Sequence, residues 1–236
     1  FWDFSAASAA SPRASVFAVR VFERGRLTDL GLEWNAEAVR QLRSGLLLGL
    51  GAALGAVLPA LAAGWAFYAP SPAAEAVFSP GKLAFVLVLL LFGAIGEELM
   101  FRGYPFQTLL PVFGEWGTIL PFSALFAVAH MGNLGSSWWS LGNTFLWGAV
   151  LSVAFVRTRS LWLPIGLHTG WNWALPGLGI QLSGFEVRLH PWVLEWRAPG
   201  VISGGVYGLE ASILTTLAAG ALLYWLMRAK AVRNEG

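Results

Sequence analysis

Residues 83–102 read LAFVLVLLLFGAIGEELMFR, so fourteen uncharged residues lead directly into the carboxylates of Glu97 and Glu98. In a membrane-spanning helix each unpaired charge costs about 2.5–3.5 kcal/mol on insertion scales, so charges there are functional by default. Glu98 and Arg102 are four residues apart, which puts them on one helix face, where they can pair. Glu97 lies about 100° further round the helix and faces elsewhere. The alternative interpretation is a polar cap at the end of the helix.

The composition of the 236-residue chain indicates the broad class of protein. Hydrophobic residues make up 56% of the chain and charged residues 12%, and its mean hydropathy is +0.62. Soluble proteins average about 45–50% apolar and about 25% charged residues. With only 15 basic and 13 acidic residues, the chain cannot cover the surface of a soluble protein of this size. We therefore expect a membrane protein and exclude an ordinary soluble enzyme, a disordered chain and a nucleic-acid binder.

The apolar runs predict an all-α fold: a polytopic transmembrane helix bundle of about six spans. The predicted spans cover residues 44–68, 83–96, 119–131, 141–156, 161–180 and 207–227. Glycines at positions 45, 49, 51 and 55 predict that the first span approaches another helix closely. The 13 Trp residues suit the two membrane interfaces. The absence of Cys excludes disulfides, thiolate metal sites and a cysteine nucleophile.

The polar segments divide the chain around this bundle. Residues 1–43 form a predicted juxtamembrane segment, 44–228 the membrane domain with its motifs at 83–176, and 229–236 a cytoplasmic tail. The chain begins at Phe1, and its apolar run at 16–21 is too short for a span. We expect either a truncated amino terminus or a short interfacial segment there.

The basic residues predict the orientation of the spans. They cluster before the first span (Arg40, Arg43), after the fourth (Arg157, Arg159) and after the sixth (Arg228, Lys230, Arg233). Six spans put all three clusters on one side, which the positive-inside rule assigns to the cytoplasm. The chain is therefore expected to be a multi-pass protein of a prokaryotic plasma membrane, with a cytoplasmic carboxyl terminus and membrane lipid as a partner.

Two histidines lie in predicted spans, whereas His190 lies in a loop. A lone histidine in a span more often makes a helix–helix hydrogen bond, but His130 and His168 together with a glutamate pair predict a site. His168 and Asn172 are four residues apart and share a helix face. Counting along the helices predicts that Glu97, His130 and His168 meet in the cytoplasmic half of the membrane.

These residue types predict hydrolysis by an activated water molecule. A carboxylate and a neutral imidazole can hold and deprotonate water, and a second imidazole with an amide can donate to an oxyanion. Glu97, His130 and His168 could instead hold a divalent metal such as zinc, although the chain has no HExxH motif. The residues alone therefore do not decide whether the protein uses a metal cofactor. A proton or ion transporter would need the same residue types, so a non-enzymatic membrane protein is the alternative.

The ordered patterns Glu-Glu-x-x-x-Arg, Phe-x-x-x-His and His-x-x-x-Asn, each in an apolar segment, resemble the CPBP (Abi, CAAX-protease-like) family of intramembrane proteases. The resemblance covers roughly residues 83–176. It implies an intramembrane (metallo)endopeptidase that cleaves a peptide or protein, in some members a lipidated one, near the cytoplasmic face. Some bacterial relatives are linked instead to immunity against bacteriocins, so an immunity or scaffold protein of the same fold is a further alternative.

The same resemblance implies a role for each motif residue. Glu97 and His130 would polarise the attacking water. Glu98 and Arg102 would organise the site, and the oxyanion pocket would consist of His168 and Asn172. Asn133 occupies a position where relatives often carry a polar residue, which is a weaker match.

Overall fold

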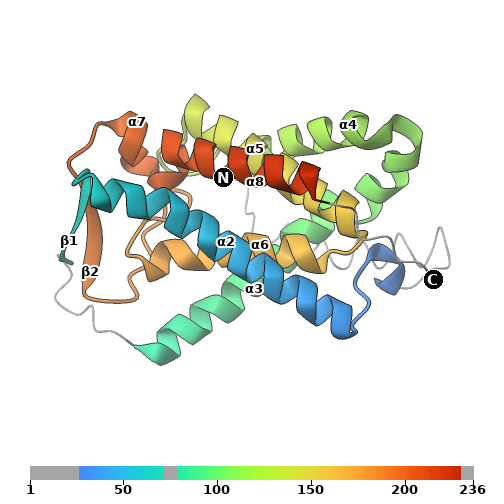
Figure 1. Ribbon diagram of the computed structural model, residues 1–236, viewed down its shortest axis with the longest axis horizontal. Helices are drawn as coiled ribbons and strands as arrows, with labels where there is room; N and C mark the ends of the chain where they lie inside the picture. Colours follow the sequence, from blue (N-terminus) through green and yellow to red (C-terminus); the bar gives the residue numbers. More distant parts are fainter. Residues whose placement is uncertain (1–26, 72–78, 230–236) are drawn as a thin grey trace.

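Side-chain caps set the starts of several helices in the computed structural model, which describes residues 27–71 and 79–229 (Figure 1). Asn35 accepts a hydrogen bond from the backbone of Ala38 at 2.9 Å, and Ser79 accepts one from Lys82 at 3.3 Å. Ser137 and Ser140 form a capping box. Such caps replace backbone partners that the first turn of a helix lacks.

The described residues form a bundle of six long helices, as predicted. They are α2 (Ala36–Ala62), α3 (Pro80–Arg102), α4 (Tyr104–Ala129), α5 (Trp138–Thr158), α6 (Trp162–Gly177) and α8 (Ile213–Arg228). Three helical stretches are long and apolar enough to cross a membrane: α2, the continuous stretch of α3 and α4, and α5. The predicted tail and the apolar run at 16–21 lie outside the described residues.

The boundaries and the secondary-structure class differ from the prediction in three places. Residues 104–113, which lie between the predicted spans 83–96 and 119–131, are helical, and the chain turns at Gly114, where φ is 72°. The last helix begins at Ile213, after the 3-10 turns η3 (Gly205–Tyr207) and η4 (Leu209–Ala211). The fold is also not purely α, because β1 (Ala66–Pro70) pairs antiparallel with β2 (Trp192–Trp196).

Glycines let α2 and α6 touch backbone to backbone. A Cβ atom added to Gly45 would lie 2.3 Å from the Leu163 oxygen, and one added to Gly170 would lie 2.3 Å from the Leu46 oxygen. Gly49 and Gly166 make equally close contacts, whereas Gly51 and Gly55 face open space. The predicted close approach is therefore confirmed for two of the four α2 glycines. It fixes the helix that carries His168.

The two ends of the bundle carry different elements. At one end Arg157 of α5 donates to the Met227 carbonyl of α8 at 2.6 Å, and Trp162 of α6 donates to the Glu33 carbonyl before α2 at 2.9 Å. The other end carries β1, β2 and the short helix α7 (Gly200–Ser203), at the left of Figure 1. We call these the basic end and the sheet end.

Candidate active site

Glu98 and Arg102 form a buried scaffold beneath the site. The Arg102 Nη1 donates to Glu98 Oε1 at 3.2 Å, as their spacing predicted, and both side chains are fully buried. Arg102 also donates to Ser152 Oγ at 3.2 Å and to the Gly148 carbonyl at 2.8 Å. These bonds tie α3 to α5. The same Glu98 oxygen lies 2.9 Å from His168 Nδ1, so it fixes the imidazole ring of α6.

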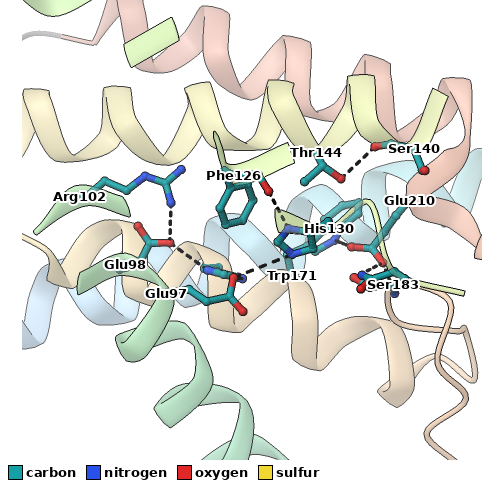
Figure 2. A network of polar contacts seen from close by, with 12 residues as sticks. Glu97, Glu98, Arg102, Phe126, His130, Ser140, Thr144, Trp171, Ser183 and Glu210 are labelled. Carbon is teal, nitrogen blue, oxygen red and sulfur yellow. Dashed lines mark hydrogen bonds and ion pairs between the residues drawn. The ribbon is translucent and has the colours of Figure 1, made fainter. Parts of the chain in front are cut away.

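Glu97, His130 and His168 converge from three helices, as predicted. Figure 2 shows Glu97 and His130 in this arrangement. The Glu97 Oε2 atom lies 4.0 Å from His130 Nε2 and 3.8 Å from His168 Nε2. Both distances exceed a direct hydrogen bond. Although it is buried, Glu97 Oε2 has no hydrogen-bond partner among the residues that the structure describes. The three groups therefore surround a space that a small polar molecule can bridge.

The hydrogen bonds assign the tautomers of the two histidines. His130 Nδ1 lies 2.8 Å from the Phe126 carbonyl, which can only accept, so Nδ1 carries the proton. In neutral His130 the Nε2 lone pair then faces Glu97. By the same reasoning His168 donates from Nδ1 to Glu98, and it can donate from Nε2 only as the imidazolium. The two rings thus offer different chemistry to one carboxylate.

A cavity of about 230 Å³ joins these residues to the sheet end of the bundle. Its lining comprises Leu90, Glu97, Phe126, His130, Thr144, Trp147, Leu151, His168, Trp171, Asn172, Leu182, Ser183, Phe185 and Glu210. The predicted residue Asn172 lies in this wall, and within the described ranges its amide makes no hydrogen bond. Asn133 is not in the wall and donates to the Tyr207 hydroxyl at 3.5 Å.

His130 lies at the end of α4, next to the loop that leads to α5. Helix α4 is kinked at Gly114, and His130 follows its last residue, Ala129. Across the site, His168 lies six residues after Trp162, the first residue of α6, which is about 9 Å from the basic end at about 1.5 Å per residue. Leu182, Ser183 and Phe185, in the segment that connects α6 to β2, border the cavity on the side of the sheet end.

Sequence reasoning missed a third carboxylate in the cavity wall. Glu210 Oε1 accepts from Trp171 Nε1 at 3.2 Å, and Oε2 accepts from the backbone and the hydroxyl of Ser183, the latter at 3.2 Å. Burial raises the pKa of the Glu210 carboxyl, and these bonds partly offset the rise. One signal was present in the sequence: Glu210 is the only charged residue between Arg197 and Arg228.

The predicted metal ligands have suitable donor atoms but not a suitable arrangement. In a tetrahedral zinc site with bonds of about 2.0–2.2 Å, the donors would lie about 3.3–3.6 Å from one another. The Glu97–His130 and Glu97–His168 distances are longer, at 4.0 and 3.8 Å. Within residues 27–71 and 79–229, no three His, Asp or Glu side chains are arranged to hold a metal ion.

Comparison with known proteins gives one match. A family model described as "Type II CAAX prenyl endopeptidase Rce1-like" matches residues 79–174. This segment holds all six predicted site residues and ends before Ser183 and Glu210. No curated protein and no solved structure matches the chain significantly. The family resemblance seen in the sequence motifs is thus confirmed over the segment that carries them.

Proposed function

We propose that this protein is an intramembrane endopeptidase, because residues 79–174 match the model of the Rce1-like type II CAAX prenyl endopeptidases. Its substrate is a peptide or protein, which the family description suggests is prenylated. The observation that carries the proposal is the position of Glu97 Oε2, 4.0 Å from His130 Nε2 and 3.8 Å from His168 Nε2.

The arrangement supports attack by an activated water molecule. Glu97 Oε2 and His130 Nε2 both accept hydrogen bonds, and one water between them can donate to each. Glu97 takes a proton from this water while the water oxygen bonds to the carbonyl carbon of the substrate. When the peptide C–N bond breaks, the proton on Glu97 passes to the departing amine. The sum of the steps is hydrolysis, with no covalent link to the protein.

The oxyanion that forms in this step needs donors, and α6 offers two. The Asn172 amide faces the cavity and is not engaged by any residue that the structure describes. His168 turns its Nε2 toward Glu97 and can donate from that atom when the ring is protonated. Donors that are fixed in advance stabilise the transition state without reorganisation. Arg102 contributes indirectly, because it holds Glu98 against His168.

The cavity reaches from the catalytic groups toward the sheet end of the bundle. His168 lies six residues after the start of α6 at the basic end, whereas Leu182, Ser183 and Phe185 line the cavity toward the sheet end. Since the basic residues assign the basic end to the cytoplasm, cleavage near the cytoplasmic face stays part of the proposal. We propose that the peptide enters from the sheet end or from the membrane, whichever compartment that end faces.

A proton or ion transporter, or a non-catalytic immunity protein, is the competing interpretation. A transport path would have to continue past Glu97 toward the basic end. The next polar groups in that direction are Glu98 and Arg102, which are fully buried and bonded to each other. This closed pair favours the peptidase.

Purified protein in liposomes, incubated with a prenylated peptide ending in a CAAX sequence, tests the proposal. We expect mass spectrometry to find two products, one of which lacks the residues after the cleaved bond, whose masses add up to that of the substrate plus one water. A pH-sensitive dye in the same liposomes should report no proton flux. Proton flux without peptide cleavage would support the transporter instead.

A further inference from the structure

A tight turn separates the catalytic cavity from a second cavity. Leu182 donates to the Phe185 carbonyl at 2.9 Å, and Phe185 donates to the Leu182 carbonyl at 2.8 Å. The central residues Ser183 and Gly184 have φ of 51° and 84°, as in a type I′ turn. Leu182, Ser183 and Phe185 line the catalytic cavity, whereas the flanking Gln181 and Glu186 line a neighbouring cavity of about 300 Å³.

Residues 207–210 hold this turn in place. Gly184 donates to the Tyr207 carbonyl at 3.1 Å. Three residues further on, the Glu210 carboxylate accepts both the backbone and the hydroxyl hydrogen of Ser183. Gly184 also packs so tightly that a Cβ atom there would lie 2.1 Å from the Leu134 oxygen. The turn is thereby fixed against the loop that follows His130.

Glu210 also connects the turn to the catalytic helix. Its second oxygen accepts from Trp171, the residue before Asn172 on α6. The Trp171 ring packs against Trp147 of α5, with ring centroids 4.6 Å apart. One carboxylate therefore joins a wall of the cavity to the helix that bears the proposed oxyanion donor.

We propose that Glu210 is a positioning residue that fixes the Ser183–Gly184 turn over the catalytic cavity, so that Leu182 and Phe185 align the substrate for cleavage. The identity of the substrate in this inference rests on the proposed function. The anchoring of the turn does not depend on it. A carboxylate suits three converging donors because it only accepts. The amide of a glutamine would present its own N–H groups to at least one of them.

Two substitutions disturb the turn from opposite sides. Glu210→Gln removes the anchor, and Gly184→Ala pushes the turn away from Leu134. Their matched controls are Glu115→Gln, an exposed carboxylate on α4, and Gly132→Ala, which has open space for a Cβ atom. Ser183→Gly is a milder variant, because it keeps the backbone donor and the left-handed conformation and removes only the hydroxyl.

The anchoring is measured without substrate by a spin label at Glu186→Cys, the exposed residue next to the turn. The chain has no other cysteine. We expect the label to be more mobile in Glu210→Gln and in Gly184→Ala than in either control, and to be intermediate in Ser183→Gly. Unchanged mobility in all three variants overturns the anchoring. If Glu210→Gln or Gly184→Ala is too unstable to purify, the mobility of the label in Ser183→Gly is compared with that in the controls instead.

The alignment of the substrate is measured by kinetics with the prenylated CAAX peptide. We expect Glu210→Gln to raise KM about tenfold, the equivalent of one hydrogen bond to a charged group, while kcat per folded molecule changes little. A merely structural role would lower the melting temperature and leave both constants of the folded protein unchanged, which contradicts the proposal. If the wild type cleaves no peptide while the spin label still responds, the proposed function fails and the anchoring stands.

Discussion

Glu98 Oε1 lies 2.9 Å from His168 Nδ1, while the neighbouring Glu97 carboxylate lies 3.8 Å from the other nitrogen of the same ring. Two adjacent glutamates thus hold different positions around one imidazole. Glu98 is fully buried and bonded to Arg102, so it serves to orient the ring. Glu97 borders the cavity, so it is the carboxylate that can meet water and substrate. This division explains why the motif needs both acids.

The buried pair should be far more important for stability than a surface pair. We expect Arg102→Ala to lower the free energy of unfolding by about 3–5 kcal/mol, because Glu98 would keep a buried charge without its partner. Thermal melting in detergent measures this loss. The control is Arg188→Ala, which breaks the exposed pair with Glu186, worth about 0–1 kcal/mol. Equal melting temperatures for the two variants would contradict the scaffold role of Arg102.

The proposed oxyanion donor should affect rate rather than binding. Asn172→Ala is expected to lower kcat about 10²–10³-fold with little change in KM, as the loss of one such donor does elsewhere. Its melting temperature should stay near that of the wild type, because the amide bonds to no residue within the described ranges. Asn133→Ala is the matched control, outside the cavity wall. A kcat per folded molecule that equals the wild-type value would remove Asn172 from the catalytic residues.

The contact between α2 and α6 should depend on individual glycines. Gly170→Ala would place a Cβ atom 2.3 Å from the Leu46 oxygen, so we expect a loss of about 1–3 kcal/mol in stability. Gly55→Ala, on the same pair of helices but in open space, should be neutral or up to about 1 kcal/mol more stable. Melting temperatures of both variants in one detergent provide the comparison. If Gly55→Ala were the more damaging, this view of the interface would be incorrect.

Contacts between residues close together in the sequence were predictable, whereas contacts between distant residues were not. The Glu98–Arg102 pair was predictable because both residues lie on one helix at a spacing of four. The meeting of Glu97, His130 and His168 followed from the resemblance to a known family and from helix lengths. The role of Glu210 was not predictable, because its partners Trp171 and Ser183 precede it by 39 and 27 residues.

Helix boundaries show a similar limit. Pro105 and Pro111 lie between two predicted spans, but Pro105 is in the first turn of α4, where a missing backbone donor costs nothing. The residues of β1 continue the apolar run of α2, so hydropathy alone could not separate the strand from the span. Their pairing with β2 involves residues more than 120 positions away, Phe67 with Glu195. Local patterns carry no information about such a partner.

The orientation in the membrane is open to direct measurement. Glu33 lies at the basic end and Glu195 at the sheet end, and both side chains are exposed. Each can be replaced by cysteine, and each replacement removes one carboxylate, so the two variants are matched. By the positive-inside rule Glu33→Cys should react with a membrane-impermeant maleimide only from the cytoplasm, and Glu195→Cys only from outside. The reverse pattern would overturn the charge-based topology.

The central claim is that Glu97 is the base that activates water. The most direct test is the cleavage rate of the prenylated CAAX peptide per folded molecule in liposomes, measured for the wild type, Glu97→Gln and the surface control Glu115→Gln. Glutamine keeps the shape of the side chain and loses its basicity. We predict that Glu97→Gln folds normally and loses about 10²–10⁴-fold in rate, the usual contribution of a general base, while Glu115→Gln keeps the wild-type rate. Turnover by Glu97→Gln at close to the wild-type rate would contradict the account.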